Sequence, residues 1–200
     1  MQSMSSEQFA AMRRDAEVVE KDGHGEKVLR LADGSYLKLF RRKSWFSKTV
    51  LFPPATRFAK NAEELERLGI ACPHIIKLYK LTNPYRSVVH YEPLEGTTLR
   101  QILNQQPSLE QLELFGMLAE FITHLHEIGV YFRSLHLGNI VLTPGGELGL
   151  IDISDMRCLG KPLPIRMRNR NYRHLLRYQS DWALVNPGAR SVIDPYSRKT

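Results

Sequence analysis

The most informative part of this 200-residue chain is residues 131–155, which read YFRSLHLGNIVLTPGGELGLIDISD. Two short apolar runs, at 140–142 and 148–151, flank Thr-Pro-Gly-Gly, a sequence that favours a tight turn, so a small β-hairpin is predicted. A hairpin brings its ends together, which places Asn139 near Asp152. A carboxamide oxygen and a carboxylate suit Mg²⁺. The alternative is that Asn139 caps a turn and Asp152 merely ends a strand.

The part of the chain before this hairpin begins with the alternation of a β-sheet. Asp-Gly at 33–34 favours a tight reversal, and in the run that follows Tyr36, Lys38 and Phe40 share one side. The predicted elements are a short helix at 6–15, three antiparallel strands within 17–40, an amphipathic helix at 56–68 and two strands at 75–81 and 87–91.

Beyond a loop at 92–96 the apolar residues recur at about every third or fourth position, which is typical of helices. In the longest of these runs, Leu112 and Phe115 are expected on the apolar face. The helices predicted there are 99–103, 109–128 and a basic one across 166–177. The fold class is therefore α+β.

Composition limits the classes of protein to which this chain can belong. Lys and Arg number 28 against 21 Asp and Glu, and the net charge of +7 favours anionic partners. Cys72 and Cys158 are far apart, which excludes a disulfide scaffold or a thiolate zinc site. No apolar run reaches the ~18 residues needed to span a bilayer, and residues 1–21 lack the apolar core of a signal peptide, so we expect a cytoplasmic protein.

The motifs around the hairpin resemble those of the protein-kinase-like fold. The kinase catalytic-loop pattern H-R-D-x-x-x-x-N has its counterpart in FRSLHLGN at 132–139, and the D-F-G that follows has its counterpart in Asp-Ile-Ser at 152–154. Together with residues 33–40 and 57–62, these motifs are similar to the bacterial lipopolysaccharide core (Kdo or heptose) kinase family, in its toluene tolerance protein branch. The resemblance extends over about 18–178.

The resemblance implies a bilobal fold, with a β-rich N-lobe at 1–91 and a minimal helical C-lobe at 92–200. It also implies ATP and Mg²⁺ as cofactors, with Asn139 and Asp152 as the metal ligands. A C-lobe of this length lacks room for the extra helices of a protein kinase, so a protein substrate is not expected.

In the N-lobe the resemblance assigns Lys38 to the nucleotide α- and β-phosphates, where the alternative is an exposed strand lysine. Gly23 and Gly25 stand at the position of a glycine-rich phosphate loop, although a plain turn explains them equally well. Tyr91 and Glu92 end the run that resembles the hinge, whose backbone groups hold adenine.

The glutamate that pairs with this lysine in kinases is less evident. Glu63, in the helix at 56–68, is the first candidate, and a solvated helix glutamate is the alternative. Spacing back from Gly69 places the position near Phe58 or Asn61 instead.

Ser134 is the main departure from the kinase pattern, because active kinases have the catalytic aspartate there. A serine hydroxyl cannot accept a proton as a carboxylate does. Phosphoryl transfer depends largely on positioning and charge neutralisation, so slow activity could remain, and His136 or Asp155 could substitute for the missing base. For His136 the alternative is a structural histidine. The catalytic candidates are therefore Ser134, His136 and Asp152.

The basic helix offers a second candidate site. Arg166, Arg170, Arg173 and Arg177 recur at spacings of three to four, so they can line one helical face, and guanidinium groups bind phosphate and carboxylate bidentately. An anionic glycolipid or sugar substrate is expected there. The alternatives are a solvated basic face and binding of acidic lipid at the inner-membrane surface.

Two functions follow from these residues. The first is an ATP-dependent kinase that acts on a lipopolysaccharide core sugar. The second is a catalytically impaired, kinase-like nucleotide-binding or scaffold protein of cell-envelope biogenesis. A nucleic-acid-binding domain rests on charge alone, because the chain has no nucleic-acid motif, and no nucleic-acid partner is expected.

Overall fold

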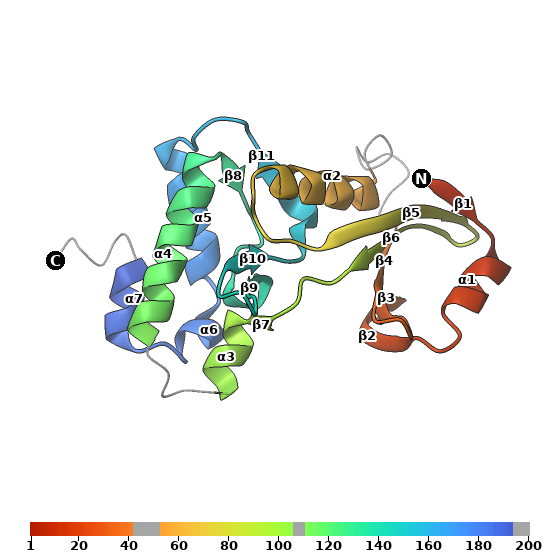
Figure 1. The fold of residues 1–200 in the computed structure, drawn as a ribbon, viewed down its shortest axis with the longest axis horizontal. Coiled ribbons are helices and arrows are strands. Elements are labelled where there is room, and N and C mark those ends of the chain that lie inside the picture. The colour runs from red at the N-terminus through yellow and green to blue at the C-terminus, as the bar shows by residue number, and fades with distance from the viewer. Residues whose placement is uncertain (42–52, 106–110, 194–200) are drawn as a thin grey trace. The chain divides into compact units, whose positions relative to one another are not determined.

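The computed structural model describes residues 1–41, 53–105 and 111–193. Packing divides the chain into two compact units, one of Met1–Glu64 with Cys72–Pro93 and one of Leu65–Ala71 with Leu94–Thr200. The first unit contains the larger sheet, and the second contains most of the helices (Figure 1). The predicted α+β class is confirmed.

The described residues of the first unit form a six-stranded sheet in the order β1-β5-β6-β4-β3-β2. β1 runs parallel to β5, and the other neighbouring pairs are antiparallel. The predicted strands before residue 92 are confirmed. The strands are β1 (Gln2–Met4), β2 (Glu17–Asp22), β3 (Gly25–Arg30), β4 (Tyr36–Arg41), β5 (His74–Thr82) and β6 (Tyr85–Glu92).

Alternation along β4 gives this sheet two different faces. Leu37 and Leu39 are buried in an apolar cluster on one face. On the other face the ammonium group of Lys38 lies 5.8 Å from the ring centroid of Phe58, which belongs to the predicted helix, α2 (Pro54–Arg67). The apolar cluster consists of Met4, Leu29, Leu31, Leu37, Leu39, Leu81 and Val88.

The predicted first helix is α1 (Ser6–Met12), and its start is fixed by a capping box. The Ser5 hydroxyl accepts a hydrogen bond from the Gln8 amide at 3.1 Å, and the Ser5 amide donates to Gln8 Oε1 at 2.9 Å. Both amides would otherwise lack an intrahelical partner. Phe9 and Met12 then pack against the apolar cluster of the sheet.

The second unit is mainly helical, and among the described residues no helix is long and apolar enough to cross a bilayer. The three predicted helices are confirmed, although residues 109 and 110 of the longest lie outside the described residues. The helices are α3 (Leu99–Gln105), α4 (Gln111–Glu127), α5 (Ile165–Leu176), α6 (Gln179–Trp182) and α7 (Pro187–Ile193). The strands are β7 (Thr97–Thr98), β8 (Val130–Tyr131), β9 (Ile140–Leu142), β10 (Leu148–Leu150) and β11 (Arg157–Cys158).

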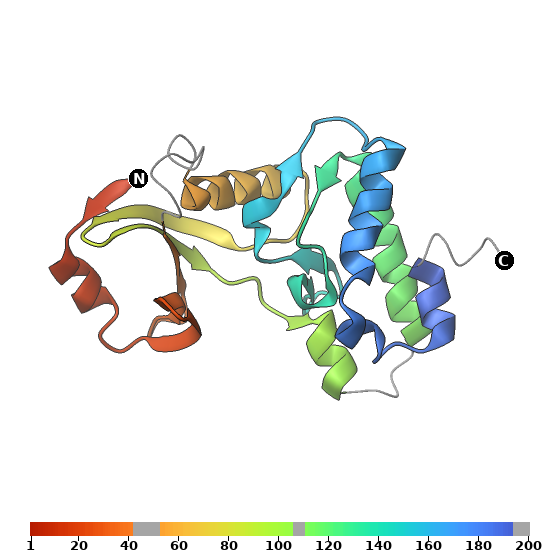
Figure 2. The same ribbon diagram turned by 180° about the vertical axis from the view of Figure 1, so that it is seen from behind.

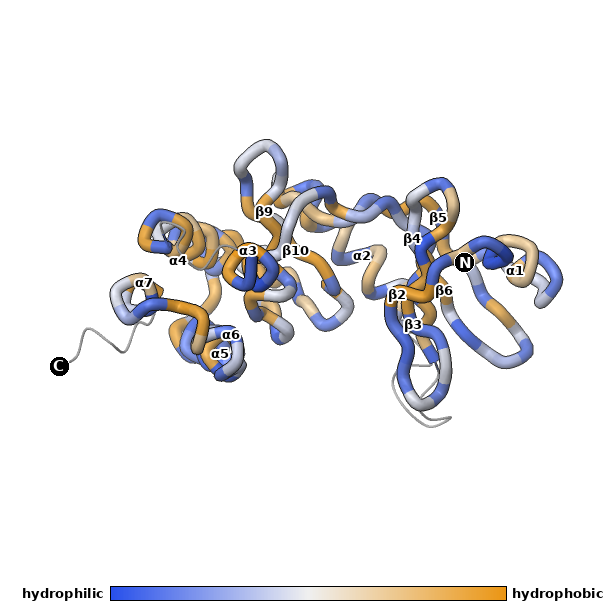
Figure 3. The backbone as a smooth tube through the Cα atoms, turned by 90° about the horizontal axis from the view of Figure 1, so that it is seen from below, coloured by the Kyte–Doolittle hydropathy of each residue, from blue (hydrophilic) through white to orange (hydrophobic). Residues whose placement is uncertain are grey.

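The predicted hairpin is confirmed as β9 and β10, in which Leu142 pairs with Leu148 and Ile140 with Leu150. Both strands are strongly apolar (Figure 3). The amide of Ile151 donates to the carbonyl of Asn139 at 3.0 Å, so the hairpin is closed at its base. Residues 139 and 152 are therefore neighbours, as the sequence predicts.

The expected apolar face of α4 is wrong at its first turn. Leu112 is 63% exposed, whereas Gln111 is only 4% exposed. The Gln111 side chain donates to the Leu184 carbonyl at 3.0 Å and accepts from the Asn186 amide at 2.8 Å, just before α7. The helix is rotated to satisfy this amide and to bury Leu114, which leaves Leu112 in solvent.

A buried polar pair joins α4 to α5, which lie side by side in Figure 2. His126 Nε2 donates to Asn171 Oδ1 at 3.1 Å, and Asn171 Nδ2 donates to the Phe132 carbonyl at 2.6 Å. His126 and Asn171 are only 2% and 1% exposed. Buried polar groups are costly unless they are paired, so this chain of hydrogen bonds fixes where residue 132 enters the following loop.

Acidification is expected to destabilise the fold. Burial is the largest cause that lowers the pKa of four histidines, His90, His126, His136 and His174, below their ordinary value of 6.5. Histidines in the unfolded chain bind protons more readily than these four do in the folded protein. The free energy of unfolding should therefore be constant above about pH 6.5 and should fall as the pH drops through the lowered pKa values.

Urea unfolding followed by circular dichroism at about pH 7.5 and about pH 5.5 measures this loss. The variant His126→Gln keeps a donor for Asn171 but does not titrate, so its free energy of unfolding should change less between the two pH values. Equal stability of the unaltered protein at both pH values would contradict the expectation.

Candidate functional site

The predicted catalytic-loop residues converge in the second unit, between β8 and β9. The Ser134 hydroxyl donates a hydrogen bond to Asp155 Oδ2 at 2.7 Å. Asn139 Nδ2 donates to the Ser134 carbonyl at 3.0 Å. The side chain and the backbone of Ser134 are thus held from both sides of the hairpin.

Asn139 and Asp152 stand where the sequence places a magnesium site. Asn139 is 7% exposed, and because its amide nitrogen is used by the Ser134 carbonyl, its Oδ1 is the atom available to a cation. Asp152 is exposed and follows β10 directly. One carboxylate and one carboxamide oxygen suit Mg²⁺, which keeps several waters and binds substrate phosphates in addition.

Asp152 has an unusual backbone. Its φ of 51° and ψ of 46° are left-handed, and among the described residues it is the one non-glycine residue with positive φ. This conformation costs about 1 kcal/mol for a residue with a side chain, and aspartate and asparagine tolerate it best. Strain of this kind is concentrated at functional sites, and here it sets the direction of the Asp152 carboxylate.

No group of three or more His, Cys, Asp or Glu side chains able to hold a metal ion occurs within residues 1–41, 53–105 and 111–193. One carboxylate with one carboxamide is a donor pair that suits a cation whose other ligands are waters and phosphate oxygens. It does not match a cage built from protein side chains alone.

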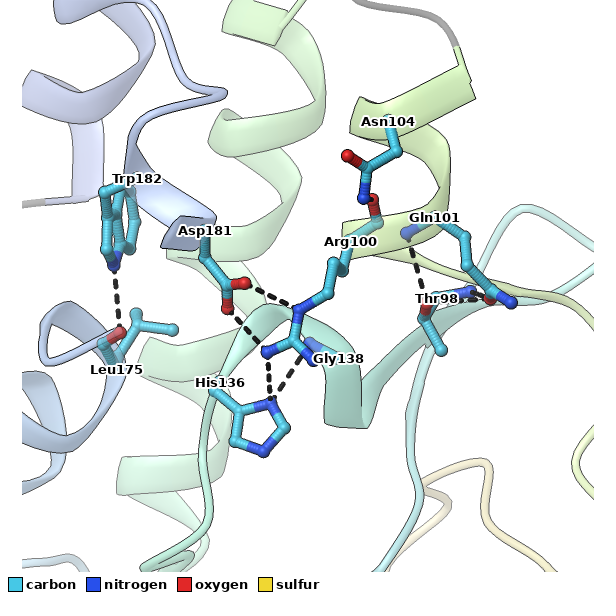
Figure 4. A network of polar contacts seen from close by, with 9 residues as sticks. All are labelled: Thr98, Arg100, Gln101, Asn104, His136, Gly138, Leu175, Asp181 and Trp182. Atoms are coloured by element: carbon cyan, nitrogen blue, oxygen red, sulfur yellow. Dashed lines mark hydrogen bonds and ion pairs between the residues drawn. The ribbon is translucent and has the colours of Figure 1, made fainter. Parts of the chain in front are cut away.

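His136 is held as a structural side chain (Figure 4). Its Nδ1 accepts hydrogen bonds from the Gly138 amide at 3.1 Å and from Arg100 Nη2 at 3.3 Å, so the proton of the neutral ring is on Nε2. Burial, and then the charge of Arg100, lower the pKa of His136. These contacts favour the structural interpretation of His136, because Nδ1 is not available to a substrate.

The ion pair that supports this histidine has no signal in the sequence. Arg100 in α3 donates to Asp181 in α6 through two bonds, Nε to Oδ1 at 2.6 Å and Nη2 to Oδ2 at 3.0 Å (Figure 4). Asp181 is 1% exposed. A Cβ atom on Gly138 would lie 2.5 Å from Arg100 Nη1, so a side chain at 138 would displace the guanidinium from its position beside Asp181 and His136.

The four arginines predicted to bind an anion share one cavity. Arg166, Arg170, Arg173 and Arg177 line a hollow of about 610 Å³ on α5, together with Asn169 and His174. All four are exposed, and among the described residues none of them forms an ion pair with a carboxylate. Arg168 points elsewhere and pairs with Glu127 at 2.8 Å. The cavity therefore carries several uncompensated positive charges.

His174 connects this arginine cavity to the catalytic loop. Burial lowers its pKa, as do the charges of Arg177, Arg170 and Arg133, whereas the charge of Asp155 opposes them. The Tyr131 hydroxyl lies 3.4 Å from His174 Nε2. His174 thus lines the arginine cavity and also contacts Tyr131, which directly precedes the predicted catalytic loop.

The nucleotide-binding candidates lie in the first unit. Lys38 is half-buried, with its ammonium group near the rings of Phe58 and Phe40 at 5.8 and 5.9 Å. Gly23 lies in the tight turn between β2 and β3, where the His24 amide donates to Asp22 Oδ1 at 2.9 Å. Gly25 begins β3 with a φ of 113°.

The remaining candidates of the first unit differ in exposure. Glu63 is exposed on α2, whereas Asn61 on the same helix is 9% exposed. Tyr91 at the end of β6 packs against Phe58, with ring centroids 5.5 Å apart, and Glu92 is exposed. Asn61, and not Glu63, is therefore the more buried of these two residues of the helix. It stands close to where spacing back from Gly69 places the glutamate that pairs with the lysine in kinases.

Comparison with known proteins is consistent with this arrangement. The model of one protein family, described as the lipopolysaccharide kinase (Kdo/WaaP) family, matches residues 10–196. A search of curated proteins finds no match.

Proposed function

Because the chain belongs to the lipopolysaccharide kinase (Kdo/WaaP) family, we propose that it transfers the terminal phosphoryl group of ATP to a sugar of the lipopolysaccharide core. The observation that carries the proposal is the convergence of Ser134, Asn139 and Asp155 beside the hairpin that ends at Asp152. The motifs at 33–40 and 131–139 favour the toluene tolerance branch of the family.

We propose that residues 1–91 act as the N-lobe and bind the nucleotide. Lys38 would bind the α- and β-phosphates, the turn at Gly23 and Gly25 would cover them, and the backbone at Tyr91 and Glu92 would hold adenine. Glu63 remains the proposed partner of Lys38, although Asn61 is the buried polar residue of that helix face.

The C-lobe, residues 92–200, would supply the metal ligands Asn139 and Asp152. When bound there, Mg²⁺ neutralises charge on the transferred phosphoryl group. Asn139 also fixes the Ser134 carbonyl, so the loop and the metal ligand are positioned together. The left-handed backbone of Asp152 sets the direction in which its Cα–Cβ bond leaves the end of the hairpin.

The acceptor would bind to the arginine cavity on α5. Its uncompensated guanidinium groups suit a sugar that carries phosphate or carboxylate, as a core glycolipid does. Because such a glycolipid is embedded in a bilayer, we propose that the protein works in the cytoplasm at the surface of the inner membrane, with this face toward acidic headgroups.

Replacing Arg170 and Arg173 together by glutamine should raise KM for the acceptor about 10²-fold, because charge-assisted hydrogen bonds contribute about 1.5 kcal/mol each when partly exposed. KM for ATP should not change. The matched control is Arg157→Gln, an exposed arginine of β11 outside the cavity. An equal rise in KM for both substrates would contradict an acceptor role for the cavity.

The proposal is tested by the transfer of labelled phosphate from ATP to purified core oligosaccharide in the presence of Mg²⁺. The unaltered protein should label the oligosaccharide, and Lys38→Met should label it at least about 10²-fold more slowly. Lys77→Met, on β5 of the same sheet, is the control and should behave as the unaltered protein.

The alternative function is a catalytically impaired, kinase-like nucleotide-binding or scaffold protein, and Ser134 is the residue that favours it. ATP binding without any transfer of label would support this alternative and would contradict the proposed kinase activity.

A further inference from the structure

We propose that Ser134 and Asp155 together take the place of the catalytic aspartate. In this arrangement the Ser134 hydroxyl contacts the acceptor hydroxyl and relays its proton to Asp155, which acts as a positioning residue and proton sink. The inference rests on the proposed kinase function and explains how that function survives a serine in the catalytic loop.

The two side chains are placed for such a relay. Ser134 Oγ donates to Asp155 Oδ2 at 2.7 Å, a short, charge-assisted hydrogen bond. Asp155 ends the 3-10 turn Ile153–Asp155, which begins directly after Asp152. The carboxylate missing from the loop at 134 is thus supplied from the far side of the hairpin, one hydrogen bond away.

The two oxygens of Asp155 have different surroundings, and these favour Ser134 as the group that contacts the substrate. Asp155 Oδ1 is buried, and among the described residues it has no hydrogen-bond partner. Ser134 is only half-buried. Asp155 is half-buried as well, but its Oδ1 is closed off and its Oδ2 accepts from Ser134, so the serine hydroxyl is the group that links this carboxylate to the acceptor. A buried carboxylate oxygen without a partner is costly, and such groups are retained where they serve the chemistry.

The surroundings supply an acceptor to this pair. His174 lines the arginine cavity and also senses the charge of Asp155. An anionic sugar held by Arg170 and Arg177 would therefore lie beside His174. The other candidate base in the loop, His136, has its Nδ1 occupied by Gly138 and Arg100.

Phosphoryl transfer through this pair conserves atoms and charge. The acceptor oxygen forms a bond to the γ-phosphorus, and the bond from that phosphorus to the β,γ-bridging oxygen breaks, with its electron pair leaving on ADP. The acceptor proton moves to Ser134 Oγ while the serine proton moves to Asp155 Oδ2. After product release the proton returns through Ser134 to solvent.

The test compares kcat of the unaltered protein with Asp155→Asn, Ser134→Ala and the double variant Ser134→Asp/Asp155→Asn. Each single variant should lower kcat about 10²-fold to 10³-fold, the usual contribution of a proton acceptor. The double variant carries a carboxylate at 134 and should regain most of kcat. Ser134→Asp alone should be slower than the double variant, because two adjacent carboxylates share one proton.

The double variant can also restore a hydrogen bond between positions 134 and 155, so the pH profile of kcat is the readout that separates a proton acceptor from a structural role. A proton acceptor makes kcat fall at acidic pH in the unaltered protein and in the double variant, and this acidic limb should be lost in Asp155→Asn. Glu147→Gln, an exposed carboxylate in the turn of the same hairpin, should leave kcat unchanged. ATP affinity measured in every variant confirms that it is folded.

Two results would overturn the inference while the kinase function stands. One is an Asp155→Asn variant with normal kcat, and the other is a double variant as slow as Asp155→Asn. If the unaltered protein binds ATP but transfers no phosphate, the proposed function fails and the relay fails with it.

Discussion

Asp152→Asn is expected to lower kcat for phosphoryl transfer about 10³-fold, which corresponds to about 4 kcal/mol of transition-state stabilisation. The substitution removes the one negative charge of the proposed donor pair. Asparagine tolerates a left-handed backbone nearly as well as aspartate, so the geometry at φ 51° should be retained. The effect then reports the loss of the proposed metal ligand and not a rearranged hairpin.

Single-turnover transfer of labelled phosphate at saturating ATP and Mg²⁺ measures this effect. Glu147→Gln removes a carboxylate from the turn of the same hairpin and should leave the rate unchanged. Raising Mg²⁺ should restore part of the lost rate in Asp152→Asn, because Asn139 Oδ1 remains as a ligand. A rate equal to that of the unaltered protein would exclude Asp152 from the reaction.

Arg100→Ala is expected to lower the free energy of unfolding by about 3 kcal/mol, because it leaves the buried carboxylate of Asp181 without a counter-charge. Asp181 is 1% exposed and receives two hydrogen bonds from this guanidinium. Part of the arginine side chain is exposed, so the effect belongs at the lower end of the range for buried pairs.

Urea unfolding followed by circular dichroism measures this change. Adding Asp181→Asn to Arg100→Ala removes the stranded charge and should recover part of the loss. The control is Arg30→Ala, whose partner Glu17 lies 3.8 Å away on the surface, and it should change the free energy of unfolding by less than about 0.5 kcal/mol. Equal effects of Arg100→Ala and Arg30→Ala would show that Asp181 does not need its partner.

The elements with strong local signals were the predictable ones. The hairpin at 140–150 combines two apolar runs with turn residues, and α2 shows helical spacing that ends at Gly69, so no distant contact is needed to recognise either. β1 has only three residues and exists as a strand because it pairs with β5. Nothing within residues 2–4 indicates that pairing.

The residues of the candidate site also fall into two groups. Some are placed by nearby sequence, and others by contacts with distant parts of the chain. Asn139 and Asp152 are near each other because the hairpin between them is short. The bond between Arg100 and Asp181 spans 81 positions, and neither residue stands in a motif. Asp155 could be named as a possible base from the sequence, but its contact with Ser134 depends on how the turn after Asp152 folds back.

Asn139 and Asp152 would carry different information about the history of this protein family. The side-chain amide of Asn139 fixes the Ser134 carbonyl, so a descendant that abandoned catalysis would still gain from asparagine at this position. Asp152 is exposed, and its left-handed backbone has a conformational cost that glycine at this position would remove. In a relative of unknown activity, retention of aspartate at 152 is therefore the better mark of a working enzyme, and glycine there would signal that selection for phosphoryl transfer has ended.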